Sequence, residues 1–345
     1  KRQIRGHAVE ARIYAEDPGN GFLPASGVLT FLEPPDESRH VRIDTGVLQG
    51  DEVSVFYDPM IAKLIAWDES REQALARLAR ALSRYRIGGP HNNVSFLYSL
   101  VSSEAYRAGQ VDTHFIEDHH ETLFHETPED QVRDLPLASL FLLLRMEQEA
   151  RARVGPGDPW SPWNASTAWR LNAPALHEGA IIVNGTAYDV PVRELGGGQR
   201  RRFGITAGGT TVRASGRIDG DKLLADIDGH RQTVEVVSDG LNFTLFAPGR
   251  SMEFSLAQPD IGEDKKRDAE DVSRAPMHGT VVKLLAESGQ SVEVDQPLLV
   301  LEAMKMEHTI CATGAGVLTS YRVAAGEQVA EGDTLFEFAR EEAVK

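Results

Sequence analysis

Residues 302–307, with the sequence EAMKME, lie between two similar halves of the last part of the chain. Each half contains a glycine, a strand-like stretch, a turn of the form SGQSV or AGEQV, and a second strand-like stretch. A shift of 37 residues superimposes the halves, aligning Ala275 with Ala312, Gly279 with Gly316, Gly289 with Gly326, Val292 with Val329 and Leu298 with Leu335. Two β-units of this size predict a small, quasi-symmetric flattened barrel over residues 275–340, with Lys305 at a hairpin tip between its halves.

Residues 126–258 combine one apolar helix with many short strands. The segment 139–146, SLFLLLRM, is apolar on nearly every face, which predicts a helix surrounded on all sides. The strand-like runs after it are separated by hairpin-type turns at Asn184-Gly185, Asp219-Gly220, Asp228-Gly229 and Asp239-Gly240. An antiparallel barrel wrapped around the helix satisfies both patterns. Residues 259–274 are charged and nearly free of large apolar side chains, so we expect a flexible linker there.

Residues 1–125 mix strand and helix signals. β-Branched, alternating stretches at 6–14 and 53–66 predict strands. Residues 70–86 form an amphipathic helix pattern, with an apolar stripe made of Ala74, Leu75, Leu78, Ala81, Leu82 and Tyr85. Ser70 and Gln73 fit a capping box at its start, and Gly88 fits its end. A second helix is expected over residues 93–102.

Composition excludes several classes of function. The chain has 345 residues, and 52 Asp and Glu against 36 Lys and Arg give a formal charge of −16, which argues against nucleic-acid and anionic-membrane binding. No apolar run approaches the roughly 20 residues that span a bilayer. The single cysteine, Cys311, excludes an internal disulfide and a multi-cysteine metal site. Because Lys1 leads directly into strand-like sequence, we expect the numbering to begin inside a larger protein.

The EAMKME segment resembles the attachment site of the biotin carboxyl carrier domain, whose motif is Ala-Met-Lys-Met, and Pro276, Met277 and Gly279 fit its Pro-Met-x-Gly segment. An isolated lysine in an exposed turn is normally a solvated surface charge. The resemblance instead implies that biotin protein ligase attaches biotin covalently to Lys305, with Met304 and Met306 as an adaptable apolar collar or as packing onto the barrel. A lipoyl domain, which has the same fold, resembles Asp-Lys-Ala at the tip rather than Met-Lys-Met.

Six blocks of the first 118 residues resemble the C-terminal subdomain of biotin carboxylase: GHAVEARIYAEDP (6–18), FLPASG (22–27), VRIDTG (41–46), YDPMIAKL (57–64), GGPHNNVSFL (88–97) and THFIED (113–118). The resemblance implies ATP- and bicarbonate-dependent carboxylation of biotin, with ATP and Mg²⁺ or Mn²⁺ bound mainly by a region upstream of Lys1. The family's catalytic arginine, in its VR-x-(D/E) segment, matches Arg42. An arginine suits this role because it stays charged and offers a planar donor fork to an enolate-like oxygen.

Other polar residues of these blocks are interpreted as structural. We expect Asp58 and Lys63 to belong to the scaffold. His114, His119, His120 and His125 lack the helical pairing of zinc sites such as H-E-x-x-H, so we expect no metal site there.

The central helix and barrel of residues 126–258 resemble the domain that docks acyl-CoA carboxylase α subunits onto the carboxyltransferase β subunit. Within this family, SPWNASTAWRLN (161–172) and MKMEHTI (304–310) resemble the α subunits of 3-methylcrotonyl-CoA carboxylases, which act in leucine degradation. Geranyl-CoA carboxylase remains an alternative, propionyl-CoA carboxylase fits less well, and a carrier and docking protein without activity of its own is a further alternative. Nothing resembles the TIM-barrel partners of sodium-pumping decarboxylases or transcarboxylases.

The expected chain is therefore an α+β multidomain protein with four parts. These are a biotin carboxylase C-terminal subdomain (1–125), a docking domain with a helix in an antiparallel barrel (126–258), a linker (259–274) and an all-β biotinyl domain (275–340). The resemblance implies a complex of six α and six β subunits. It places the protein in the cytoplasm of a bacterium, which we favour, or in the mitochondrial matrix of a eukaryote.

Overall fold

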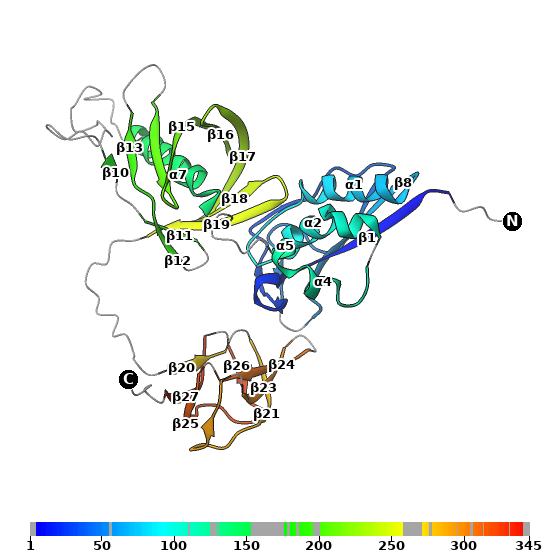
Figure 1. The fold of residues 1–345 in the computed structure, drawn as a ribbon, viewed down its shortest axis with the longest axis vertical. Helices are drawn as coiled ribbons and strands as arrows, with labels where there is room; N and C mark the ends of the chain where they lie inside the picture. Colours follow the sequence, from blue (N-terminus) through cyan, green and yellow to red (C-terminus); the bar gives the residue numbers. More distant parts are fainter. Residues whose placement is uncertain are drawn as a thin grey trace.

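The computed structural model describes residues 5–54, 57–109, 111–124, 130, 132–152, 176–177, 180–183, 186–195, 201–257, 271–275, 278–294, 296–303, 306–312, 314–330 and 332–340. We call 5–124 the first region, 130–257 the middle region and 271–340 the third region. Each region has its own hydrophobic core. The middle region contacts the first, and Leu23 of the first region packs against the core of the third (Figure 1).

A three-stranded antiparallel sheet, ordered β1-β8-β6, organises the described part of the first region. Its strands are β1 (His7–Tyr14), β6 (Val41–Thr45) and β8 (Met60–Asp68). Helices α1 (Arg71–Leu82) and α2 (Val94–Ser102) pack on one face of it, burying Ile13 and Leu64. Shorter elements complete the region: β2 (Glu16–Asp17), η1 (Pro18–Asn20), β3 (Leu23–Pro24), β4 (Gly27–Val28), β5 (Phe31–Glu33), β7 (Glu52–Val53), β9 (Arg86–Gly88), α3 (Glu104–Ala108), α4 (Phe115–Asp118) and α5 (His120–Phe124).

Helix α1 follows the sequence pattern at its start and departs from it at its end. The Ser70 side chain accepts a hydrogen bond from the Gln73 backbone N–H, which confirms the predicted cap. All six residues of the predicted apolar stripe are buried. The helix ends at Leu82, so the prediction that Gly88 terminates it is wrong. Gly88 lies in β9, where it pairs with Phe31 of β5, because backbone pairing with a distant strand outweighs a local stop signal.

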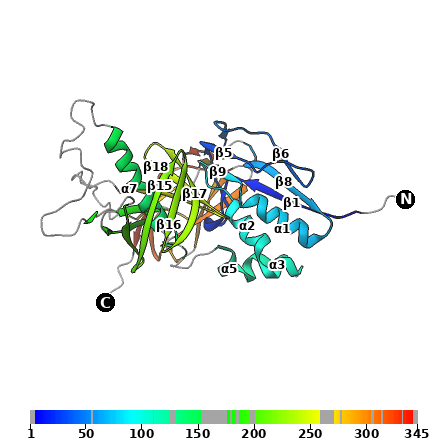
Figure 2. The same cartoon turned by 90° about the horizontal axis from the view of Figure 1, so that it is seen from above.

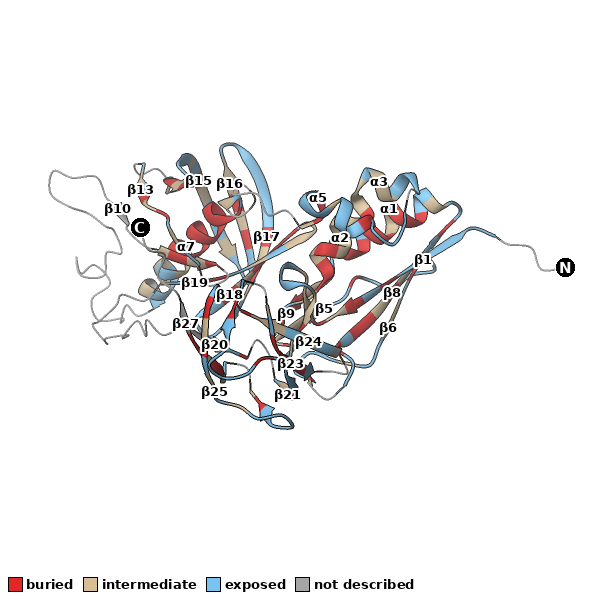
Figure 3. Ribbon diagram, turned by 60° about the horizontal axis from the view of Figure 1, so that its bottom comes forward, coloured by how far each residue is buried: buried red, intermediate tan, exposed pale blue. Residues whose placement is uncertain are grey.

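The middle region is a curled antiparallel sheet around one helix, as predicted. In the described residues the sheet has ten strands in the order β10-β13-β14-β15-β16-β17-β18-β19-β11-β12. Helix α7 (Leu135–Ala152) lies against it, with Leu140 fully buried among inward-facing side chains such as Phe203 and Leu245. The strands are β10 (Leu176–His177), β11 (Ala180–Val183), β12 (Thr186–Asp189), β13 (Val192–Glu194), β14 (Phe203–Ala207), β15 (Thr210–Asp219), β16 (Lys222–Ile227), β17 (His230–Asp239), β18 (Asn242–Ala247) and β19 (Arg250–Leu256). Figure 3 shows the buried face of α7 turned toward these strands.

Tight turns set the register of the long hairpins in this sheet. Between β16 and β17 the chain turns at Asp228 and Gly229, whose φ angles are 50° and 86°. Two successive positive φ angles are what a type I′ turn requires, and Asp-Gly is among the sequences that tolerate them. Gly220 and Gly240 also have positive φ, at the predicted turns on either side. The Asn184-Gly185 turn lies outside the described residues.

The third region consists, in its described residues, of two four-stranded antiparallel sheets, ordered β20-β27-β25-β22 and β24-β23-β21-β26. The strands are β20 (Asp271–Arg274), β21 (Gly279–Leu284), β22 (Ser291–Val292), β23 (Pro297–Ala303), β24 (Met306–Cys311), β25 (Gly316–Tyr321), β26 (Gln328–Val329) and β27 (Thr334–Arg340). The predicted repeat is visible in the structure, because β21, β22 and β23 begin 37 residues before β25, β26 and β27, respectively. Leu298 and Leu335 occupy equivalent places in the core.

One boundary differs from the sequence prediction. Residues 271–274, expected in the linker, form β20 and pair with β27. Their charged composition does not indicate a strand, because the strand forms only by pairing with β27 near the end of the chain. Residues 258–270 lie outside the described part of the chain.

The first and middle regions meet along β5 and β9 on one side and β17 and β18 on the other, as the view from above shows (Figure 2). The rings of Phe31 and Phe246 lie 5.7 Å apart across this junction. Arg86 pairs there with both Glu33 and Glu235.

Candidate functional site

Arg42 lies on the exposed face of the first region's sheet, opposite the face that α1 covers. On a strand, residues two apart point to the same side, so β6 presents Arg42 and Asp44 together. Arg42 Nε donates a hydrogen bond to Asp44 Oδ1 at 2.7 Å, and 72% of the Arg42 side chain is exposed. A charged, accessible guanidinium with a fixed neighbour is suited to binding an anionic oxygen.

Lys63 joins this pair from the neighbouring strand. The register of β6 and β8 places Asp44 directly opposite Lys63, and Lys63 Nζ lies 3.8 Å from Asp44 Oδ2. The two oxygens of Asp44 therefore face two different cations. The hydrogen bond from Arg42, with Lys63 adding to it, lowers the pKa of Asp44 and keeps it ionised. The hydrogen bond to Asp44 also raises the pKa of Arg42.

The sequence interpretation of this face was incomplete. It identified Arg42 but did not single out Asp44, although the spacing of two residues on a strand was a usable signal. It treated Lys63 as scaffold, and in the structure Lys63 lies on the same face, with Nζ 3.8 Å from Asp44 Oδ2. Asp58 has a local role, since its Oδ1 accepts a hydrogen bond from the Met60 backbone N–H at 3.0 Å.

The second candidate site is the hairpin of β23 and β24 in the third region. Ala303 pairs with Met306, and Glu302 pairs with Glu307, so residues 304 and 305 are the ones between two paired strands. Met304 and Lys305 themselves lie outside the described residues, and Met306 begins β24. The position of Lys305 at a junction between the halves of the repeat therefore stays a prediction.

Two of the first region's histidines have packing roles. The His119 ring stacks on Phe115 at 4.3 Å and forms a hydrogen bond with the Phe115 carbonyl oxygen, and His120 stacks on Phe124. Across the described ranges, no group of three or more His, Cys, Asp or Glu residues could hold a metal ion. His125 falls outside these ranges. None of the described helices is long and apolar enough to cross a membrane.

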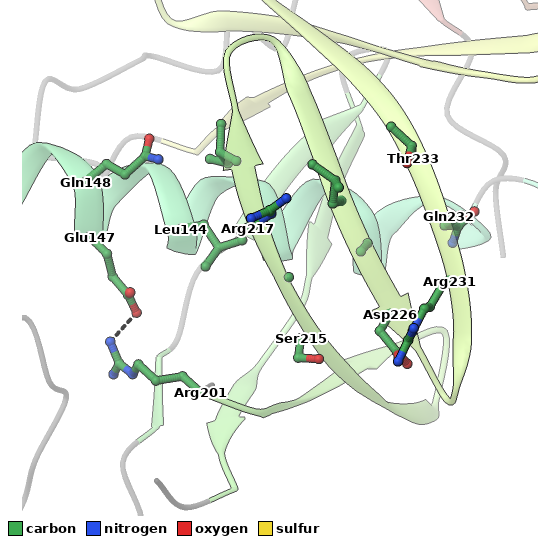
Figure 4. A pocket seen from close by; sticks show the side chains of 14 residues that line it. Leu144, Glu147, Gln148, Arg201, Ser215, Arg217, Asp226, Arg231, Gln232 and Thr233 are labelled. Carbon is green, nitrogen blue, oxygen red and sulfur yellow. Dashed lines mark hydrogen bonds and ion pairs between the residues drawn. The ribbon is translucent and has the colours of Figure 1, made fainter. Parts of the chain in front are cut away.

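A cavity of about 690 Å³ lies between the C-terminal half of α7 and strands β15, β16 and β17 (Figure 4). Its charged side chains are largely paired with one another. Arg201 pairs with Glu147 and, at 2.8 Å, with Glu194, and Arg231 lies 3.5 Å from Asp226. None of the residues predicted to carry function is among those that line this cavity.

Three family models match successive parts of the chain. Residues 10–118 match the biotin carboxylase C-terminal domain, residues 133–259 the BT domain of the methylcrotonyl-CoA carboxylase alpha subunit, and residues 271–338 the biotin-requiring enzyme domain. The matched ranges follow the three regions of the fold in order. The motif at 161–172 falls in the second range but outside the described residues.

Curated relatives resemble the chain over nearly its whole length. It is 36% identical to the mitochondrial methylcrotonoyl-CoA carboxylase subunit alpha of Dictyostelium discoideum over 96% of this chain and 48% of that protein. The corresponding mouse subunit is 33% identical over 99% of this chain and 48% of its own length. The propionyl-CoA carboxylase alpha chain of Ruegeria pomeroyi is 28% identical over 97% of this chain and 52% of its own length. The chain thus spans about half the length of the curated relatives it matches.

Among solved structures, the biotin carboxylase subunit of a pyruvate carboxylase is 33% identical over 36% of this chain and 28% of that chain, with a TM-score of 0.35.

Proposed function

The chain belongs to the biotin-dependent carboxylase family, with methylcrotonyl-CoA carboxylase alpha subunits among its relatives, and on this premise we propose that it is the biotin-bearing part of an acyl-CoA carboxylase α subunit. The observation that carries the proposal is the order of the three regions. A catalytic subdomain, a helix-in-barrel domain and a biotinyl domain follow one another along a single chain, and AMKM stands at the repeat junction of the last.

Lys305 is the proposed attachment point of biotin. The ligase joins the biotin carboxyl group to Lys305 Nζ in an amide bond, with AMP leaving from an activated biotinyl adenylate. The pairing of Ala303 with Met306 supports this role, because an enzyme that acylates a lysine needs it to project from a tight turn between held strands. The bound biotin supplies a ureido nitrogen that accepts a carboxyl group at one site and gives it up at another.

Arg42 is the proposed catalytic residue of the first region. Its donor groups fit an anionic oxygen on the biotin ring, since the side chain is exposed and its charge is held by the hydrogen bond with Asp44. Binding of ATP and its Mg²⁺ or Mn²⁺ would fall mainly to the ATP-grasp part of the family's catalytic domain rather than to residues 1–125. The contribution of the first region to biotin carboxylation is then the Arg42 guanidinium and the sheet that positions it.

The middle region is the proposed docking domain for a carboxyltransferase β subunit, within a complex of six α and six β subunits. Its support is the match of residues 133–259 to the BT domain. The third region then carries biotin between the two sites. Tethering keeps the local biotin concentration high and makes each encounter intramolecular.

We place the acyl-CoA substrate as 3-methylcrotonyl-CoA, an intermediate of leucine degradation. Identities of 36% and 33% to methylcrotonoyl-CoA carboxylase subunits, against 28% to a propionyl-CoA carboxylase chain, favour this choice. Geranyl-CoA and propionyl-CoA carboxylases are the alternatives. The compartment follows the source: the cytoplasm for a bacterial protein, which we favour, and the mitochondrial matrix for a eukaryotic one.

Mass spectrometry of the protein produced together with a biotin protein ligase tests the first step. We expect a biotinyl group on Lys305, lost in Lys305→Arg and retained in Lys283→Arg, a matched control on the exposed part of β21. Lipoate at that position would replace the biotin assignment with a lipoyl domain.

Purification of the full natural protein with its β subunit, followed by bicarbonate fixation on 3-methylcrotonyl-, geranyl- and propionyl-CoA, tests the carboxylase activity and the choice of substrate. Activity on propionyl-CoA alone would overturn the substrate assignment.

A further inference from the structure

Arg42 is held through one side of its guanidinium group. Its Nε donates to Asp44 Oδ1 at 2.7 Å, while in the described part of the chain neither of its terminal nitrogens has a hydrogen-bond acceptor. A guanidinium is planar and rigid, so a bond at Nε fixes the orientation of the whole plane. The two terminal amino groups then have no acceptor among the described residues and are available to a ligand.

Asp44 is itself constrained from its other side. Lys63 Nζ faces Oδ2 of Asp44 at 3.8 Å, from the residue directly opposite on β8. Each carboxylate oxygen thus faces its own cation, and rotating both oxygens onto Arg42 would move Oδ2 away from Lys63. A bidentate pair through Nε and Nη2 would occupy one of the terminal nitrogens and compete with a ligand.

The stability that this arrangement provides is small. The Arg42 side chain is 72% exposed, and exposed ion pairs contribute little to folding stability because solvent screens them. Its geometry therefore has more consequence for what Arg42 can bind than for holding the sheet together, which β1, β6 and β8 achieve by backbone pairing and an apolar face.

We propose that Asp44 is a positioning residue that holds Arg42 by its Nε and turns the two terminal amino groups toward the ligand, with Lys63 keeping Asp44 in place. The inference rests on the proposed function, because it takes Arg42 as the group that contacts the biotin oxygen. It adds the residue through which the orientation of Arg42 is set.

The test uses the full natural protein and measures ATP-dependent carboxylation of free biotin. Asp44→Asn should lower kcat about 10- to 100-fold, in line with loss of an orienting partner, and leave KM for ATP within about twofold. Asp44→Glu should recover much of the rate. Glu10→Gln is the matched control, since Glu10 pairs with Arg12 on the same sheet, at 3.3 Å, and its loss should leave the rate unchanged.

A double-mutant comparison separates positioning from a structural effect. In an Arg42→Met background, Asp44→Asn should cause no further loss, because there is no guanidinium left to orient. Additive losses, or an equal loss in Glu10→Gln, would overturn the inference while leaving Arg42 as the catalytic group. A fully active Arg42→Met protein would remove Arg42 itself from the mechanism, and a wild-type protein that cannot carboxylate biotin would overturn the proposed function.

Discussion

Arg86 of the first region forms an ion pair with Glu235 of the middle region. The same guanidinium nitrogen also pairs with Glu33, so one cation joins two carboxylates from different parts of the chain. The Glu235 side chain is only 12% exposed. Burial raises the pKa of Glu235, and Arg86 opposes that shift by stabilising the charged form.

Replacing Arg86 should loosen the junction between the two regions. In Arg86→Met, Glu235 stays largely buried beside Glu33 without its cation, which we expect to cost about 2 kcal/mol of stability. Hydrogen exchange measured along β5, β9 and β17 should then increase. Adding Glu235→Gln should recover part of the loss by removing the unpaired charge. Arg80→Met, an exposed change on α1, is the control, and equal exchange in the two single variants would contradict the bridging role.

A second pair anchors the start of α7 to the barrel. Arg250 on β19 donates from Nε and Nη2 to the two oxygens of Asp134, at 2.6 and 2.8 Å, and the Asp134 side chain is 8% exposed. Arg250→Met would leave that carboxylate buried and unpaired, lowering the free energy of unfolding by about 3 kcal/mol. Chemical denaturation should show this, whereas Arg231→Met should be nearly neutral, because Arg231 is 85% exposed and lies 3.5 Å from its partner.

Gly216 allows the helix and the sheet to approach closely. A Cβ atom there would lie 2.7 Å from the Leu224 carbonyl oxygen and 3.1 Å from Leu140 Cδ2 of α7. Gly216→Ala should therefore destabilise the middle region by about 1–3 kcal/mol through overpacking. Gly204→Ala on the adjacent strand is the control, since the nearest atoms to its Cβ would be those of the Leu195 side chain, at 3.5 Å or more. Thermal unfolding that fails to separate the two variants would argue that the helix can shift to accommodate the methyl group.

Local patterns in the sequence predicted the elements well where the cause of the structure is itself local. The stripe of α1, the all-round apolar surface of α7 and the 37-residue repeat each follow from side chains a few residues apart or from internal symmetry. The assignment of Arg42, which a motif of adjacent residues carries, stays a prediction. The three-region architecture is confirmed by the fold and by the family matches.

Local patterns could not predict the strand pairings and side-chain contacts between residues that are distant in the chain. Gly88 was wrongly assigned to a helix end, because local sequence does not show its pairing with Phe31, 57 positions earlier. Strand β20 was wrongly assigned to a linker for the same reason, since its partner β27 lies at the other end of the region. Likewise, the link of Asp44 to Lys63 exists only once β6 and β8 are in register. Pairings of this kind are set by tertiary packing rather than by residue preference.

Because Tyr85 is buried, we expect the free energy of unfolding to depend on pH in the alkaline range. Tyr85 follows α1 and is 5% exposed in the core of the first region, where desolvation raises its pKa from 10.0 to about 12. Below pH 10 the phenol is neutral in both the folded and the unfolded chain. Between pH 10 and 12 only the unfolded chain releases the proton, so the free energy of unfolding falls as pH rises, by about 3 kcal/mol over the window.

Tyr85→Phe should remove this part of the pH dependence, because phenylalanine cannot ionise in either state. Denaturant unfolding of the first region at intervals from pH 9 to pH 11 measures it. The variant's stability should decline less steeply than that of the wild type above pH 10. Tyr57→Phe, a change at a side chain that is 77% exposed, should leave the wild-type slope in place. Parallel curves for wild type and Tyr85→Phe would mean that the folded protein opens around Tyr85 before the phenol ionises.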